Sequence, residues 1–151
     1  MTNTTDIPNV KLHLGLLLHL ANQFKDQLIN QYFSDTDITA AQFKVLISIY
    51  KGFNRPIEIS KNLLMDAGAM SRMIERMVKR ELIVRNPNPE DKRQVILALT
   101  DKGRAICDRF QNEALASIIG LLTARLTVGE SRQLEALLIK MLPDEAIQPH
   151  R

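Results

Sequence analysis

The residues best suited to chemistry in this chain are arginines and lysines, and they gather in two neighbouring segments. In the first, residues 70–80, Arg72 and Arg76 are four positions apart, which places both on one face of a helix. The second contains the tripeptide Asp91-Lys92-Arg93, between two short apolar runs. Guanidinium groups offer paired N–H donors that match guanine edges and phosphates, so this pattern predicts contact with a nucleic acid.

The first segment is strongly amphipathic. Apolar side chains at positions 70, 73, 74, 77 and 78 form one arc of a helical wheel, and small, polar and charged residues form the opposite arc. A solvated basic face would also produce this pattern in an isolated helix. The candidate nucleic-acid contacts on the polar arc are Gly68, Ser71, Arg72, Arg76 and Lys79.

The second segment has the pattern of a β-hairpin. Leu82-Ile83-Val84 and Val95-Ile96-Leu97 flank a loop rich in Asn, Pro and Asp. We expect Lys92 and Arg93 to lie over an adjacent minor groove or the backbone, and Asp91 to orient Arg93 or Arg76 through a charge-assisted hydrogen bond. A helix, a tight turn, a second helix and a basic hairpin in this order predict a winged helix-turn-helix, an arrangement that engages two grooves of DNA.

Local signals predict the elements that position these residues. Capping residues and periodicity indicate a mainly α fold (α+β), with one hairpin among the helices. Pro56 is well placed in the first turn of the first helix of the helix-turn-helix, and Asp66 is the expected N-cap of the second. The predicted helices cover residues 9–33, 39–50, 57–64, 67–81, 101–122 and 127–141, and loose ends are expected at 1–9 and 143–151.

The N-terminal helix carries too many apolar residues to pack on one side. Leucine occupies positions 12, 14, 16, 17, 18, 20 and 28, so the apolar stripe surrounds much of the helix. A terminal helix of this kind usually packs against a partner chain. We therefore expect one domain over residues 1–151, with dimerisation helices at 10–36 and 101–143 and a winged helix-turn-helix at 37–100.

Composition narrows the functional classes. The chain has 151 residues and a net charge of +3, and the excess of Lys and Arg over Asp and Glu lies between Arg55 and Arg109. A single cysteine, Cys107, excludes an internal disulfide and is expected to be a buried structural residue. No signal peptide or membrane-spanning stretch is evident, so a cytoplasmic protein without membrane contact is expected.

The sequence gives no support to an enzyme. It contains no paired carboxylates, glycine-rich phosphate loop or nucleophile elbow, and no cofactor is expected. His13 and His19 are six positions apart, and His150 has no cysteine near it, so we expect no metal site.

Three stretches of the chain carry a family resemblance. These are Asp37-Ile-Thr-Ala-Ala-Gln-Phe-Lys-Val-Leu46, the hairpin segment Arg85-x-Pro-Asn-Pro-x-Asp-Lys-Arg93, and Leu99-Thr100. They resemble the MarR family of bacterial repressors, and the similarity extends over roughly residues 10–143. The resemblance implies a homodimer that binds a pseudo-palindromic operator in double-stranded DNA and is released by small aromatic anions such as salicylate. Antibiotic or stress resistance genes are the implied targets.

The resemblance also implies roles for individual residues. Ser71, Arg72 and Arg76 correspond to contacts of the recognition helix, and Arg93 with Asp91 to the wing. The anion pocket implied by the family combines two guanidinium groups with apolar surfaces suited to a ring, from Pro56, Ala69, Met73, Arg76 and Arg85. The alternative from another class is a winged helix that binds proteins and has no specific operator.

Overall fold

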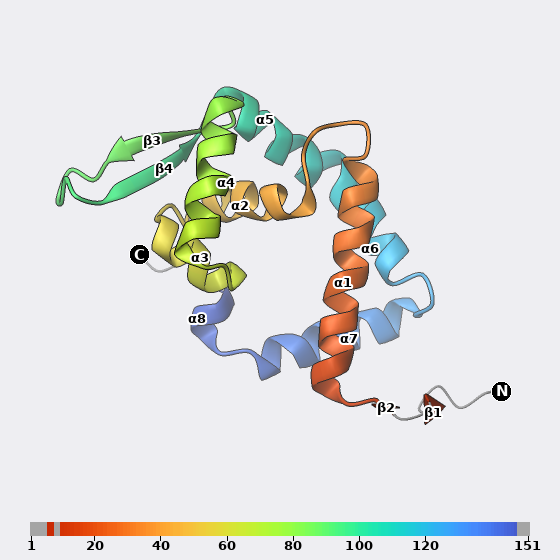
Figure 1. Ribbon diagram of the computed structural model, residues 1–151. Coiled ribbons are helices and arrows are strands. Elements are labelled where there is room, and N and C mark those ends of the chain that lie inside the picture. The colour runs from red at the N-terminus through yellow and green to blue at the C-terminus, as the bar shows by residue number, and fades with distance from the viewer. Residues whose placement is uncertain (1–5, 8–9, 148–151) are drawn as a thin grey trace.

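The structure is a computed structural model that describes residues 6, 7 and 10–147 (Figure 1). It is mainly helical, with two small antiparallel sheets. The described elements are β1 (Asp6–Ile7), β2 (Val10–Lys11), α1 (Leu14–Tyr32), α2 (Ala40–Tyr50), α3 (Pro56–Leu63), α4 (Ala67–Lys79), β3 (Ile83–Pro87), β4 (Val95–Leu99), α5 (Asp101–Arg109), the π-helical turn η1 (Phe110–Ala114), α6 (Leu115–Leu122), α7 (Val128–Met141) and α8 (Asp144–Ile147).

The predicted starts of α2, α4 and α7 are confirmed by their caps. At α2 the backbone N–H of Gln42 donates to Thr39 Oγ1 (3.1 Å), and the Thr39 N–H donates to Gln42 Oε1 (3.2 Å). The same reciprocal pair joins Thr127 to Glu130 at α7. Asp66 caps α4 by accepting a hydrogen bond from the N–H of the third residue of the helix (2.7 Å). Each cap satisfies donors that a helix start otherwise leaves unpaired.

Several predicted boundaries are wrong. α1 begins at Leu14 rather than at residue 9, because His13 caps it: Nδ1 of His13 accepts from the backbone N–H of Leu16 at 3.2 Å. The helix predicted over 101–122 is interrupted by the π-turn η1, which inserts one wide turn between α5 and α6. The tail predicted to lack regular structure contains α8.

Helix ends in the helix-turn-helix share one geometry. Gly52, Leu64 and Glu81 each follow a helix and have positive φ angles of 107°, 53° and 59°. After α4, the N–H of Leu82 donates to the Met77 carbonyl (3.0 Å) and the N–H of Glu81 to the Val78 carbonyl (2.9 Å), which is the Schellman pattern. This reversal ends α4 at Lys79, two residues before the predicted end, and turns the chain directly into β3.

One hydrophobic core lies inside the winged helix-turn-helix. Its buried residues come from α2, α3, α4, β3, β4 and α5, so every element of the unit contributes. Ile83 and Leu97 anchor the base of the hairpin in this core, and the N–H of Leu97 donates to the Asn54 carbonyl (2.7 Å). The hairpin is thereby fixed at its base to the helices behind it.

A second core joins α1 to α2, η1 and α6. It contains Phe33, Phe43 and Phe110, whose rings contact one another with centroids 4.3 to 6.2 Å apart. Only the C-terminal end of α1 reaches this core, through Leu28 and Ile29. The N-terminal part of α1 and all of α7 lie at the end of the molecule away from the hairpin, as Figure 1 shows, and no residue of α7 is buried.

Within residues 6, 7 and 10–147, no helix combines the length and apolar character that crossing a membrane requires.

Candidate nucleic-acid interface

Helices α3 and α4 form the helix-turn-helix. Three residues, 64–66, connect them, and the cap formed by Asp66 fixes where α4 begins. Met70, Ile74 and Met77 bury one face of α4 in the core. The burial of this face aims the opposite face of α4 at solvent.

The structure places all five predicted contacts of α4 on that exposed face: Gly68, Ser71, Arg72, Arg76 and Lys79. Gly68 has a specific steric role there. A Cβ at this position would lie 3.3 Å from Nη1 of Arg72 and 3.3 Å from Oδ1 of Asp66, so the absence of a side chain leaves room for the guanidinium beside the first turn. The Arg72 guanidinium therefore lies beside the first turn of α4, at the end that enters a DNA groove in helix-turn-helix proteins.

One acidic residue shares the exposed face of α4. Glu75 lies four positions before Lys79, and its carboxylate is 3.7 Å from the Lys79 ammonium. Both side chains are more than half exposed, so this ion pair is weak. Lys79 remains available to a phosphate, because a surface pair of this kind exchanges readily with solvent and ions.

The tip of the hairpin is a compact seven-residue loop, residues 88–94. Asp91 Oδ1 accepts hydrogen bonds from both the backbone N–H and Nε of Arg93, each at 3.1 Å. Of the two partners predicted for Asp91, the structure therefore pairs it with Arg93. The Arg93 side chain is still 91% exposed, so its guanidinium is oriented yet free to bind a ligand. Lys92 beside it is also exposed.

The recognition helix and the hairpin tip project to one side of the molecule. In Figure 1, α4 and the β3–β4 hairpin lie together at the left of the view, away from α1, α6 and α7. This arrangement presents Arg72 and Arg76 on a helix and Arg93 on a wing, the two contacts that a winged helix makes with adjacent grooves.

The residues of the predicted anion pocket lie on α4 and on the two elements that contact it, α3 and β3. Pro56 begins α3, and Ala69 and Met73 are partly buried on α4. Arg76 and Arg85 are exposed, on α4 and β3 respectively. The two guanidinium groups and the apolar surfaces thus come from three adjacent elements of the helix-turn-helix.

Sequence reasoning missed Arg80, the residue that ends α4. Its Nη1 donates to the Asp37 carbonyl (2.8 Å) and to Gln42 Oε1 (3.2 Å), tying the end of α4 to the start of α2 and the segment before it. The Asp37 contact spans 43 positions of the chain, so no local spacing signals it. Arg80 couples the recognition helix to the rest of the protein.

The sequence predicts neither a reactive cysteine nor a metal site. Cys107 is fully buried in the core, and desolvation raises the pKa of its thiol to about 11, so little thiolate exists at neutral pH. Among the described residues, no three His, Cys, Asp or Glu side chains are grouped so as to hold a metal ion. His150 lies outside the described residues.

Comparison with known proteins identifies the family. The sequence model of the MarR family matches residues 38–95. The multiple antibiotic resistance protein MarR of Escherichia coli (strain K12) is 45% identical over 144 residues, which are 95% of this chain and 100% of that protein. The chain belongs to the MarR family. The predicted mainly α winged-helix fold and the predicted family are confirmed.

Solved structures of MarR-family proteins have the same fold as this chain. A mutant MarR from E. coli complexed with operator DNA has a TM-score of 0.74 and 46% identity, covering 86% of this chain and 94% of that one. BpsR of Bordetella bronchiseptica, whose DNA binding is regulated by 6-hydroxynicotinic acid, has a TM-score of 0.69 and 29% identity, covering 85% and 92%. MarR-family proteins are DNA-binding transcriptional regulators, not enzymes, and the chain is a transcriptional repressor of this class.

Proposed function

We propose that the protein is a cytoplasmic homodimer that represses transcription by binding a pseudo-palindromic operator, and that a small aromatic anion such as salicylate releases it. The observation that carries the proposal is that α4 and the β3–β4 hairpin lie together on one side of the molecule (Figure 1), with Arg72 and Arg76 exposed on the helix and Arg93 exposed in the hairpin loop. The operator-bound E. coli relative supports the choice of DNA as the partner. The regulated genes are expected to confer resistance to antibiotics or stress, as the name of that relative suggests.

The terminal helices support dimerisation. They expose large apolar side chains that a second copy would cover in an isologous twofold interface. They include Leu14, Leu17, Phe24, Leu121, Val128, Leu134, Leu137 and Ile139. Light scattering at micromolar concentration should report twice the chain mass of 17.2 kDa. A stable folded monomer under these conditions would contradict the proposal.

Operator contacts are tested by removing single guanidinium groups. If Arg72 and Arg76 contact bases, Arg72→Ala and Arg76→Ala should each cost about 1–3 kcal/mol of operator affinity and relax sequence preference. Arg93→Ala should weaken binding more evenly across sequences, because the wing mainly contacts the backbone. Arg104→Ala, at an exposed arginine of α5 outside both proposed surfaces, is the matched control and should change neither. Binding is measured by gel shift against the DNA upstream of the protein's own gene.

Salt dependence distinguishes DNA binding from protein binding. A protein with about 6–10 phosphate contacts loses about 10³- to 10⁵-fold in affinity between 50 and 200 mM salt. A steep fall of this size is expected here. A flat response, or no shift with any DNA, would instead favour a winged helix that binds proteins.

The anion pocket is tested with Arg85. We propose that the carboxylate of salicylate lies between Arg76 and Arg85, with its ring against Pro56, Ala69 and Met73. Arg85→Ala should then blunt release by salicylate and spare operator binding more than Arg76→Ala does. Benzoate and acetate are the ligand controls. Release by acetate as effective as release by salicylate would mean that ionic screening, and not this pocket, dissociates the complex.

A further inference from the structure

Glu75 lies at the centre of the exposed face of α4. At about 100° per residue, it is about 140° around the helix from the buried Met70 and about 160° from the buried Met77. Gly68 and Lys79 flank it at about 20° and about 40°. An acidic side chain therefore occupies the part of α4 that points most directly away from the core, in the middle of the predicted DNA contacts.

The position of Glu75 in α4 matches the spacing of base-reading residues. In the homeodomain, a variant of the helix-turn-helix, the recognition helix reads bases with residues at positions i, i+3, i+4 and i+7. Gly68, Ser71, Arg72 and Glu75 have this spacing in α4, and all four are exposed. A helix that brings Ser71 and Arg72 to base edges therefore brings Glu75 there as well.

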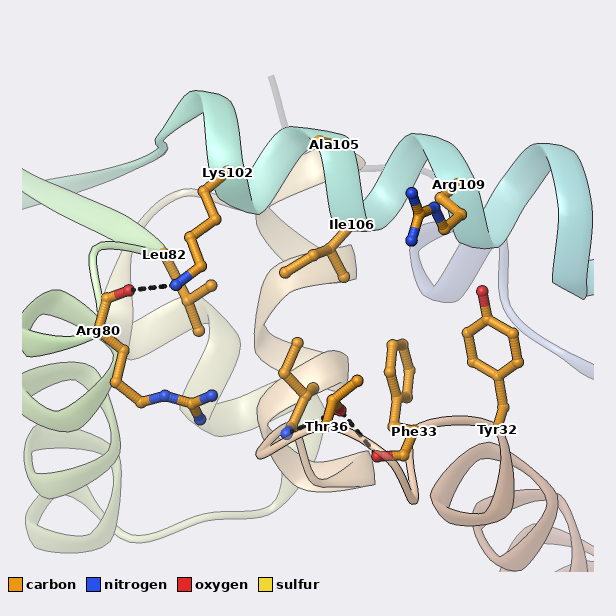
Figure 2. Close-up of a pocket in the computed structure, with 10 residues that line it drawn as sticks. Tyr32, Phe33, Thr36, Arg80, Leu82, Lys102, Ala105, Ile106 and Arg109 are labelled. Carbon is orange, nitrogen blue, oxygen red and sulfur yellow. Dashed lines mark hydrogen bonds between the residues drawn. The ribbon is translucent and has the colours of Figure 1, made fainter.

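Contacts at both ends of α4 fix the direction of this face. At the start of the helix, Asp66 accepts a hydrogen bond from the N–H of Ala69 at 2.7 Å. At its end, Lys102 reaches across from α5 and donates from Nζ to the carbonyl of Arg80 at 3.2 Å (Figure 2). Glu75 is thus presented on a rigid element, which is what reading a single base edge requires.

The carboxylate of Glu75 has only a distant partner within the protein. Its ion pair with Lys79 spans 3.7 Å, and the Glu75 side chain is 59% exposed. The acidic residue Asp91 of the hairpin loop differs, because its Oδ1 accepts a hydrogen bond from Nε of Arg93 at 3.1 Å. Asp91 therefore orients a neighbouring arginine, whereas Glu75 keeps its acceptor oxygens for a ligand.

The negative charge of Glu75 restricts the bases that it can contact. A carboxylate on a DNA-binding face is repelled by the phosphates, and this repulsion is offset only where the carboxylate accepts a hydrogen bond from a base. In the major groove, cytosine alone presents a donor, its N4 amino group, without an acceptor. Adenine adds the acceptor N7 to its donor, and guanine and thymine present acceptors. An acidic side chain at this position therefore favours cytosine.

We propose that Glu75 is a specificity-determining residue that accepts a hydrogen bond from N4 of a cytosine in the major groove. Glu75 follows Arg72 by three residues, which is about 4.5 Å along the helix axis, compared with about 3.4 Å between base pairs. The cytosine therefore lies within about two base pairs of the base that Arg72 contacts. This contact rests on the proposed function, because it needs an operator that α4 reads.

The base preference is measured by selecting binding sites from a random double-stranded DNA library, in parallel for the wild type, Glu75→Gln and Glu75→Ala. The wild type should enrich cytosine at one position of each half-site. A glutamine amide pairs with N6 and N7 of adenine, so Glu75→Gln should move the preference at that position toward adenine. Glu75→Ala should accept all four bases there, and should bind unselected DNA more tightly because the repelling charge is gone.

Titrations with the enriched site give the size of the effect. Replacing the selected C·G pair should weaken binding of the wild type by about 5- to 150-fold, the usual effect of one mismatched base pair. The same replacement should leave the affinity of Glu75→Ala unchanged. Glu90→Gln is the matched control, because it removes one negative charge from the exposed hairpin loop. It should alter the overall affinity without changing the preferred base at any position.

The outcomes distinguish the role of Glu75 from operator binding itself. If the wild type and Glu75→Ala enrich the same site, or if Glu75→Ala relaxes a position that prefers a base other than cytosine, the role of Glu75 is overturned and operator binding stands. An equal change of base preference in Glu90→Gln would show that net charge, and not a base contact, is responsible. If the wild type enriches no sequence, the proposed function is wrong, and the base contact with it. Circular dichroism should show folded variants, since position 75 is exposed and both Ala and Gln favour helices.

Discussion

The winged helix-turn-helix buries its large apolar side chains, whereas the terminal helices leave many of theirs exposed. In the first region, α2, α3, α4 and the hairpin surround one core, and Leu46, Ile59 and Met77 are completely buried within a single chain. In the second region, α7 buries none of its residues, and Leu137 and Ile139 are 57% and 60% exposed. Apolar surface is therefore removed from water within one region and remains in contact with water in the other.

This difference indicates what each region needs in order to be stable. The DNA-reading unit completes its packing internally, so its exposed residues are free to be polar and basic. The terminal helices retain well-formed backbones, with a complete capping box at Thr127, yet they lack a covering surface. Such helices gain most of their stability from tertiary or quaternary packing rather than from local signals. The comparison predicts that the stability lost through a mutation depends on protein concentration for the terminal helices and not for the winged helix-turn-helix.

The largest expected effect is on the core of the DNA-reading unit. Met77→Ala removes a fully buried side chain and should lower the free energy of unfolding by about 2–5 kcal/mol at every protein concentration. Leu137→Ala, at an exposed position of α7, should instead shift the concentration at which the proposed dimer dissociates. Urea titrations at several protein concentrations separate the two. If both variants lose stability independently of concentration, the contrast between the regions is wrong.

A smaller effect on stability is expected where α5 packs against the residue that precedes β3. A Cβ at Gly103 would lie 2.2 Å from the Leu82 carbonyl oxygen, so Gly103→Ala forces α5 away from the hairpin and should cost about 1–3 kcal/mol. Gly120 in α6 is the matched control. Nothing lies within 4 Å of the position that its Cβ would occupy, and Gly120→Ala should stabilise the protein by about 0.5–1 kcal/mol. Thermal unfolding measures both; a loss of stability in Gly120→Ala would indicate that α6 is covered at that point.

The smallest effects are expected from removing the same kind of N-cap in each region, which compares the two regions directly. Thr39→Ala and Thr127→Ala each remove the side chain that accepts from the third residue of a helix, and each should cost about 1 kcal/mol. For Thr39 the loss should appear in global unfolding, since α2 lies in the core. For Thr127 it should appear mainly as faster amide exchange in α7 below the dimer dissociation constant. Hydrogen-exchange NMR distinguishes them; identical behaviour would show that α7 unfolds together with the core.

Much of the fold follows from local sequence signals, because the interactions that encode it are themselves local. A capping box requires only residues three positions apart, and this suffices to place the starts of α2 and α7. The two apolar runs and the turn residues between them, within residues 82–99, likewise suffice for the hairpin, which the structure forms between β3 and β4. The amphipathic pattern of α4 determines which side is buried, so the exposure of Arg72 and Arg76 follows from it.

Other features leave no clear signal in the local sequence, and only the tertiary structure decides them. The choice of Arg93 over Arg76 as the partner of Asp91 depends on the exact path of the hairpin loop. The π-turn at Phe110 has no signal in helical periodicity, which continues through it. The hydrogen bonds of Arg80 to Asp37 and Gln42 form because the end of α4 packs beside the start of α2, which is about 40 positions earlier in the chain. Periodicity predicts the face of a helix on which a side chain lies. A site also requires faces of different elements to lie at the right distance from one another, and only the packing of those elements sets that distance.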